Sequence, residues 1–216
     1  MNSVKVYLMR HGHVEFPKGL FYGQMNVPLS QKGKRQSLLA ARRVLSLGID
    51  SVVSSDLRRC TYLSELILRE GGPGPYLSEA IREVNFGRWA GLSWDDIERD
   101  YPGAMETRMK NLATFRPPGG ESLGDLLDRA KTEFKRCARG DYGKRVAFVA
   151  HGGVNRVLIA DFLGMDLQNI FSLHQDHTCI NCVEFFPDGN GVLRFLNMTT
   201  HLEGCPPGLS SSNSGR

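Results

Sequence analysis

The chain has 216 residues, 41% of them hydrophobic, with 27 basic and 23 acidic side chains and a net charge of +4. A chain of this length and apolar content can bury one sizeable core, so we expect one domain. The small net charge, without a basic stripe or a run of like charges, argues against nucleic acid as a partner. The first apolar run is too short for a signal peptide or a membrane span, which predicts a cytoplasmic protein with no membrane partner.

Apolar runs of strand length alternate along the chain with segments of helical periodicity. Strands are expected, in chain order, at 4–9, 50–55, 145–150, 180–186 and 192–198, and helices at 31–47, 56–70, 122–139 and 153–163. Ser122, with Asp125 three residues later, predicts a capped helix start, and Gly164 predicts a helix end. This alternation is typical of an α/β fold with a mostly parallel sheet. The turn sequence PDGNG between the last two runs predicts an antiparallel hairpin at a sheet edge.

The domain is expected to cover residues 1–202. The segment 203–216 is rich in Pro, Gly and Ser and has little to bury, so we expect it to be disordered. Five scattered cysteines fit a reducing compartment better than a disulfide framework. Cys179 and Cys182 form a CxxC pair, but the residues around them alternate like a strand, which favours packing over redox chemistry.

Two of the expected strands end in a histidine. Arg10 and His11 follow the first strand directly, and His151 and Gly152 follow the run at 145–150. The carboxyl ends of parallel strands meet at the edge of the sheet where ligands bind. A helix that opens after His151 would aim unpaired amides and its positive dipole end at the same place, so the expected ligand is an anion.

A second arginine and a carboxyl group complete the predicted site. Arg58 stands in the first turn of the helix expected after the strand at 50–55, so we expect it to point at the same edge. Arginine's planar fork matches the oxygens of a phosphoryl group. Glu83 is the candidate acid and base, in a loop rich in glycine and aromatic residues.

Six motifs, in this order, carry a resemblance to a known family: RHG, PLSQKG, SSDLRRC, EVNFGRWAGLS, PPGGES and AHGG. Together they resemble the histidine phosphatase superfamily, the branch that includes cofactor-dependent phosphoglycerate mutases, over the chain to about His201. The resemblance implies a single-domain, three-layer α/β/α fold of the phosphoglycerate mutase type, with an antiparallel strand at the sheet edge. It implies that His11 is the nucleophile and Glu83 the proton donor, and that the phosphoryl group is bound by Arg10, Arg58 and His151.

Other pocket positions depart from the family pattern. His13 and Val14 stand where an acidic residue and Ser or Thr are usual, Pro17 stands near a frequent Asn, and Asn26 replaces a frequent Asp. Gly23, Gln24 and Gly152 are still expected to bind substrate phosphate. No metal and no cofactor are expected, because arginines and histidines would offset the phosphoryl charge. His13, His174 and His177 lack an accompanying carboxylate cluster, so loop positions are expected for them rather than metal ligation.

Three functions fit these residues: a phosphomonoesterase with a phosphohistidine intermediate, a 2,3-bisphosphoglycerate-dependent mutase and a noncatalytic phosphate-binding module. Only 67 residues separate Glu83 from His151, which leaves little chain for the lid of a mutase and favours a phosphatase. The motifs are most similar to those of alpha-ribazole phosphatases of cobalamin biosynthesis, with broad-specificity and sugar-phosphate phosphatases as alternatives. A flat leaving group would pack against aromatic side chains, namely Phe16, Phe21, Tyr22, Phe86 and Trp89. The expected partner is a small-molecule phosphomonoester substrate. The sequence determines neither its identity nor the oligomeric state, for which a homo-oligomer is one option.

Overall fold

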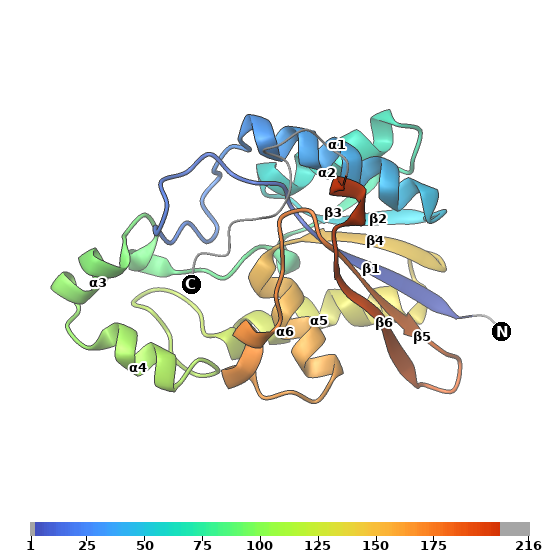
Figure 1. The fold of residues 1–216 in the computed structure, drawn as a ribbon. Coiled ribbons are helices and arrows are strands. Elements are labelled where there is room, and N and C mark those ends of the chain that lie inside the picture. Colours follow the sequence, from blue (N-terminus) through green and yellow to red (C-terminus); the bar gives the residue numbers. More distant parts are fainter. Residues whose placement is uncertain (1–2, 204–216) are drawn as a thin grey trace.

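A six-stranded sheet forms the centre of the molecule. The structure is a computed structural model that describes residues 3–203. The strands stand in the order β3-β2-β4-β1-β5-β6 (Figure 1). They comprise β1 (Val4–Arg10), β2 (Ser51–Ser55), β3 (Pro75–Ser78), β4 (Arg145–Ala150), β5 (Ile180–Phe185) and β6 (Gly191–Met198). The pairs β3/β2, β2/β4 and β4/β1 are parallel, whereas β5 pairs antiparallel with both β1 and β6. The predicted mostly parallel α/β fold and its edge hairpin are confirmed.

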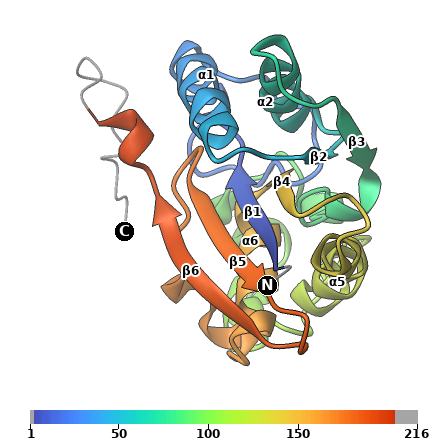
Figure 2. The ribbon, with the colours of Figure 1, turned by 90° about the vertical axis from the view of Figure 1, so that its right-hand side faces the viewer.

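Helices cover both faces of the sheet. Figure 2 shows α1 (Gln31–Ser46) and α2 (Arg58–Arg69) on one face and α5 (Leu123–Arg139) and α6 (Gly152–Phe162) on the other. All four begin and end within about two residues of their predicted bounds. Ser122 caps α5 as expected, since its hydroxyl accepts a hydrogen bond from the amide of Asp125 at 3.1 Å. The three-layer arrangement is therefore confirmed.

The central strand β1 is buried on both faces. Val6 and Leu8 pack into the core on the side of α5 and α6, whereas Tyr7 and Met9 pack against α1 and α2. Side chains along a strand alternate between its two faces, so a strand covered by helices on both sides is apolar almost throughout. This burial explains why the apolar run stops where β1 reaches the edge of the sheet.

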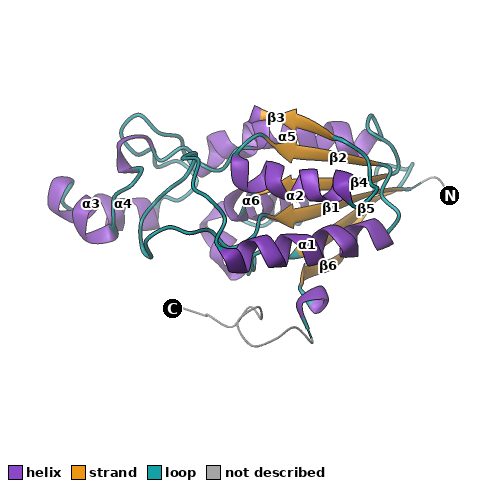
Figure 3. Cartoon of the chain, turned by 90° about the horizontal axis from the view of Figure 1, so that it is seen from above, coloured by secondary structure: helices purple, strands orange, loops and turns teal. Residues whose placement is uncertain are grey.

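The segment between β3 and α5 holds elements that the sequence pattern did not reveal. It contains two short helices, α3 (Trp94–Asp100) and α4 (Ala104–Lys110), and the single turns η1 (Glu79–Ile81) and η2 (Gly87–Trp89). Further short 3-10 helices, η3 (Leu167–Ser172) and η4 (Thr200–Leu202), lie later in the chain. Figure 3 shows α3 and α4 beyond the end of the sheet toward which β1 points. Trp89, Ile97 and Met105 form a small separate core beneath these helices, so the segment is anchored beside the strand ends.

The structure also bears on the expectations for the cysteines and for membrane-spanning segments. Cys60, Cys137, Cys179 and Cys182 are buried and unpaired within residues 3–203, and Cys182 lies in β5, as expected of packing residues. In the same residues, no helix has the length and apolar content needed to cross a bilayer. The predicted disordered tail falls, apart from Glu203, outside the described residues.

Candidate active site

His11 and His151 meet at the carboxyl ends of two neighbouring strands. Arg10 and Ala150 are partners in the register of β1 and β4, and the next residue of each strand is one of these histidines. Their ring centroids lie 5.2 Å apart, edge to face, and the residues are 1% and 0% exposed. The sheet therefore brings together the two histidines that are separated in sequence.

The orientation of His11 leaves one ring nitrogen for chemistry. Its Nδ1 lies 2.8 Å from the carbonyl oxygen of Gly12. Burial lowers the pKa of His11 well below the usual range, and the positive charges of Arg59 and Arg10 act in the same direction. A neutral ring that donates from Nδ1 to Gly12 keeps a lone pair on Nε2, which is the form that a nucleophile needs.

His151 has protein partners on both ring nitrogens. Arg59 donates from Nε to its Nδ1 at 3.2 Å, and its Nε2 lies 2.9 Å from the hydroxyl oxygen of Ser55. Burial, followed by the charges of Arg59 and Arg10, lowers the pKa of His151 well below the usual range. A neutral ring that accepts at Nδ1 donates from Nε2 to Ser55. A phosphoryl group that bonds to His151 must therefore replace one of these contacts.

The arginine that accompanies the histidines is Arg59, not Arg58. Arg58 is exposed at the start of α2, so the expectation that it points at the strand ends is corrected. Arg59 is 1% exposed. It donates to the carbonyl oxygens of Met25 at 2.7 Å and Gly23 at 2.6 Å, in addition to His151. A guanidinium has five N–H donors, so two remain for a ligand.

The phase of α2 decides between the two arginines. Successive side chains turn by about 100° around a helix, so Arg58 lies about 100° from Arg59 and falls outside the stripe of buried residues. The buried face of α2 comprises Arg59, Cys60, Leu63, Ser64 and Ile67. The i, i+4 spacing of positions 59, 63 and 67 was a sequence signal for Arg59.

Arg10 presents a free donor at the strand ends. It donates from Nη1 to the carbonyl oxygen of Gln175 at 2.5 Å, while its buried Nε has no hydrogen-bond partner in the described residues. Gly152, the first residue of α6, leaves room in front of this atom, because a Cβ there would lie 3.3 Å from Arg10 Nε. An anion is the natural partner for a buried guanidinium donor beside a helix amino terminus.

The carboxyl group of Glu83 lies against the amino terminus of α6. Its Oε2 accepts from the amide of Gly153 at 3.1 Å, and its Oε1 accepts from the amide of Val84 at 3.0 Å. A Cβ at position 153 would approach Glu83 Oε1 too closely, so any larger residue there would displace this carboxyl. Glu83 is therefore held where a proton can pass to a group bound in front of α6.

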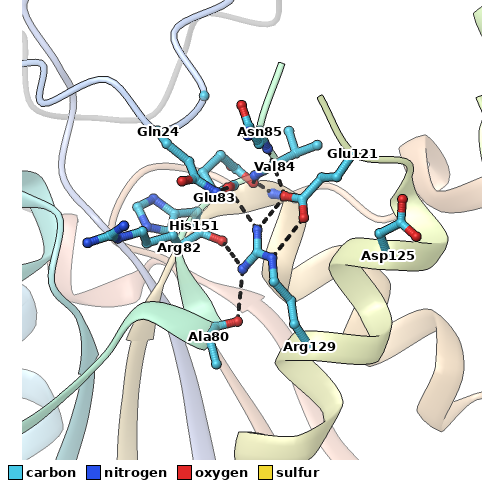
Figure 4. A network of polar contacts seen from close by, with 12 residues as sticks. Gln24, Ala80, Arg82, Glu83, Val84, Asn85, Glu121, Asp125, Arg129 and His151 are labelled. Carbon is cyan, nitrogen blue, oxygen red and sulfur yellow. Dashed lines mark hydrogen bonds and ion pairs between the residues drawn. The ribbon is translucent and has the colours of Figure 1, made fainter. Parts of the chain in front are cut away.

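Two contacts support the main chain of Glu83. Gln24 donates from Nε2 to the carbonyl oxygen of Glu83 at 3.0 Å. Arg129 of α5 donates to the same oxygen at 2.9 Å and also to the carbonyl oxygens of Ala80 and Arg82, at 2.8 and 2.7 Å (Figure 4). Arg129 is itself held by Glu121 through a bidentate ion pair. Gln24 thus bonds to the loop of Glu83 in this structure, and Arg129 was missed by sequence reasoning.

Asn26 contributes to the local fold. Its Oδ1 accepts from the amide of Arg58 at 3.0 Å, which satisfies a free donor at the start of α2. This contact fixes the beginning of the helix that carries Arg59.

A third histidine lies beside the nucleophile candidate. The His177 ring centroid is 5.8 Å from that of His11 and 5.1 Å from that of His13, which itself lies 2.9 Å, at Nδ1, from the Ser30 hydroxyl oxygen. His174 is exposed and pairs with Asp176. Within residues 3–203, no group of three or more His, Cys, Asp or Glu side chains is arranged to hold a metal ion.

A cavity of about 200 Å³ opens beside Glu83. Phe21, Tyr22 and Phe86 line it, as expected of a pocket for a flat group. Trp89 does not, because it is fully buried under α3 and α4, and Phe16 packs against Tyr22 instead. The remaining lining includes Leu20, Gly23, Val84, Arg108, Leu123, Gly153, Arg156, Ile170 and Phe171. Sequence reasoning assigned no role to the two arginines of this wall.

Comparisons with known proteins identify the family of the chain. The model of the histidine phosphatase superfamily, branch 1, matches residues 6–198. Phosphoserine phosphatase 1 of Hydrogenobacter thermophilus is 29% identical over 201 residues, which cover 92% of this chain and 94% of that protein. The probable phosphoglycerate mutase GpmB of Salmonella paratyphi B is 30% identical over 163 residues, 75% of this chain and 76% of that protein.

Solved structures of phosphatases share the fold of this chain. Mycobacterial glucosyl-3-phosphoglycerate phosphatase has a TM-score of 0.80 and 25% identity, with 91% of this chain and 100% of that chain covered. The alpha-ribazole phosphatase of Shigella flexneri has a TM-score of 0.82 at 22% identity, covering 90% and 96%, a likeness that shows the fold alone. The chain belongs to the histidine phosphatase superfamily, branch 1, and it is an enzyme of that superfamily.

Proposed function

We propose that this enzyme hydrolyses phosphomonoesters through a phosphohistidine on His11. The observation that carries the proposal is the orientation of His11, whose Nδ1 is bound to the carbonyl of Gly12 while the free donor of Arg10 and the guanidinium of Arg59 lie nearby. A lone pair on Nε2 and positive charges around it are what attack on a phosphoryl dianion requires.

In the first step, Nε2 of His11 forms a bond to phosphorus while the bond from phosphorus to the ester oxygen breaks. Glu83, protonated at the start, gives its proton to the departing alkoxide. In the second step, ionised Glu83 takes a proton from a water molecule, whose oxygen attacks phosphorus and releases His11. The cycle ends with alcohol, phosphate and a protonated Glu83, so atoms and charges balance.

Arg10, Arg59 and His151 are proposed to hold the phosphoryl oxygens throughout. Arg59 replaces Arg58 in this role, because only Arg59 is buried beside the histidines. Two remaining donors of Arg59 and the unpartnered Nε of Arg10 would bond to oxygens in the equatorial plane. Gly23 and Gly152 are proposed to leave room for the group, and Gln24 to hold the Glu83 loop.

Alpha-ribazole 5'-phosphate is the proposed substrate from sequence, and the rings of Phe21, Tyr22 and Phe86 in the cavity support a flat leaving group. The relatives named for phosphoserine and glucosyl-3-phosphoglycerate support acidic substrates instead. Mutase activity is the second candidate, because one relative is named a probable phosphoglycerate mutase. A phosphohistidine exposed to water would favour hydrolysis over transfer.

The proposal is tested by trapping the phosphoenzyme. Rapid quench with a ³²P-labelled monoester should give one acid-labile, base-stable label per chain, which is absent in His11→Asn. His174→Asn is the matched control, since His174 is exposed and lies outside the cluster. Turnover at the wild-type rate in His11→Asn would overturn the mechanism. Prolonged chelation should leave the rate unchanged, and a requirement for added Mg²⁺ or Zn²⁺ would contradict the proposed role of the arginines.

A further inference from the structure

Two arginines in the wall of the cavity have no carboxylate partner. Arg108 comes from α4 and Arg156 from α6, and both line the cavity beside Glu83. Neither takes part in an ion pair with any residue of the described segment 3–203. Both therefore differ from Arg129, whose charge is neutralised by a bidentate ion pair with Glu121.

The polar contacts of the two side chains leave donors unused. Arg156 donates from Nε to the carbonyl oxygen of Leu173 at 2.8 Å, and Arg108 reaches the sulfur of Met109 at 3.8 Å. Aromatic rings back both guanidiniums: Arg108 Cζ is 5.9 Å from the ring centroids of Phe21 and Phe86, and Arg156 Cζ is 5.9 Å from Phe171. Rings orient the guanidinium planes without neutralising their charge.

The partial burial of these charges is unfavourable without a ligand. Burial lowers the pKa of Arg108 and Arg156, and the charge of Arg10 adds to the effect at Arg156. Glu83 is the one acidic residue in the lining of the cavity, and its two carboxyl oxygens already accept from main-chain amides. A buried charge is favourable only when it is paired, so an anion supplied by a ligand would relieve this arrangement.

The cavity adjoins the candidate phosphoryl site. Arg10, His11, Arg59 and His151 do not line it, whereas Glu83 does. With the ester oxygen at Glu83, the proposed proton donor, the rest of the alcohol extends from the strand ends into the cavity. The group that meets the two arginines therefore belongs to the leaving alcohol and not to the phosphoryl group in transfer.

We propose that Arg108 and Arg156 bind a second anionic group, a carboxylate or a second phosphate, on the leaving alcohol of the substrate. The inference rests on the proposed phosphatase function and narrows its substrate class to acidic phosphomonoesters. It disfavours alpha-ribazole 5'-phosphate, whose leaving group carries no anion. Charge-assisted hydrogen bonds to such an anion should favour acidic over neutral substrates roughly ten- to a hundredfold in kcat/KM.

The test compares phosphate release from matched pairs of substrates. In the first pair, 3-phosphoglycerate carries a carboxylate where glycerol 3-phosphate carries a hydroxymethyl group. In the second pair, propane-1,3-diyl bisphosphate carries a second phosphate where 3-hydroxypropyl phosphate carries a hydroxyl group. We expect the anionic member of at least one pair to react at least about tenfold faster in kcat/KM. The pair with the larger ratio identifies the anion. Equal or faster turnover of both neutral members, or of alpha-ribazole 5'-phosphate, overturns the inference while the phosphatase function survives.

Substitutions in α4 provide a second, independent test of the inference. Arg108→Met should lower the ratio within the preferred pair at least about fivefold, and Arg108→Lys should lower it less because the charge is kept. Lys110→Met is the matched control: it removes one charge from the same helix, at a side chain that is 68% exposed and outside the cavity, and should keep the ratio. An unchanged ratio in folded Arg108→Met overturns the role of Arg108. If no phosphomonoester is hydrolysed and no phosphohistidine forms, the proposed function itself fails.

Discussion

Arg59 donates a hydrogen bond of 3.2 Å from its Nε to Nδ1 of His151. The bond joins the first turn of α2 to the end of β4, and both side chains are almost completely buried. Because the guanidinium is always charged, it keeps Nδ1 as an acceptor and fixes His151 in its neutral form. The same guanidinium is tied to the loop of Gly23 and Met25, so one residue aligns three segments around the candidate phosphoryl site.

Replacing Arg58 and Arg59 one at a time should separate the roles of these two neighbouring arginines. Arg59→Met should lower kcat/KM by roughly a hundred- to a thousandfold, because a preorganised donor to the phosphoryl oxygens is lost. Arg58→Met removes the same charge from an exposed position and should change kcat/KM by less than about threefold. Steady-state kinetics of both variants on one substrate decide the matter. A larger loss in Arg58→Met would restore the assignment made from sequence.

The role of Glu83 should appear in the dependence of rate on the leaving group. Glu83→Gln cannot protonate the departing oxygen, so alkyl phosphates should lose roughly a hundredfold or more in kcat. p-Nitrophenyl phosphate has a stable leaving group and should lose much less. Parallel assays of both esters in wild type and variant measure the difference. Equal losses on the two esters would remove Glu83 from the role of proton donor.

Arg129 is expected to act as a positioning residue for Glu83. It donates to the carbonyl oxygens of Ala80, Arg82 and Glu83 and so holds the main chain on the amino-terminal side of the Glu83 carboxyl group. Arg129→Lys cannot make all these bonds, and a misplaced catalytic carboxyl should reduce kcat roughly ten- to a hundredfold with a smaller change in KM.

The dependence of rate on the leaving group distinguishes a displaced Glu83 carboxyl group from a general loss of structure. Arg129→Lys should slow alkyl phosphates more than p-nitrophenyl phosphate, in the same direction as Glu83→Gln. Arg136→Lys is the control on the same helix, where the arginine is half exposed and pairs with Glu133 and Asp141. Equal slowing of both esters in Arg129→Lys would point to a loss of structure without a specific effect on Glu83.

Acid should weaken the fold through the buried histidines. Burial lowers the pKa of His11 and His151 in the folded state, so the unfolded chain takes up a proton near pH 6.5 while the folded chain does not. Unfolding then binds protons, and the free energy of unfolding falls as the pH drops below about 6.5, by about 1.4 kcal/mol per pH unit for each histidine. Above this pH the two histidines contribute no slope.

Urea unfolding between pH 8 and pH 5 measures this effect. His11→Asn should reduce the slope below pH 6.5 by the share of one histidine. His174→Asn, at an exposed position, is the control and should keep the wild-type slope. An identical slope in wild type and His11→Asn would show that His11 is protonated alike in the folded and unfolded chains.

The amino-acid sequence by itself determined the four long helices, the strand ends that carry Arg10, His11 and His151, and every strand of the sheet except β3 (Pro75–Ser78) at its edge. Each of these follows from local patterns: buried strands are apolar until they reach the edge of the sheet, and capped amphipathic helices repeat their apolar side chains every three to four residues. The order of the motifs added the family, because six short segments in the right succession are far more specific than any one of them.

Tertiary structure decided which arginine faces the histidines and what surrounds Glu83. The choice between Arg58 and Arg59 depends on where α2 begins, and Asn26, from a distant loop, caps that start. The cavity combines α4, α6 and the loop at Phe21, and Arg129 reaches Glu83 from α5. Local periodicity gives the face of each element, but contacts between segments far apart in the chain depend on how those faces pack together.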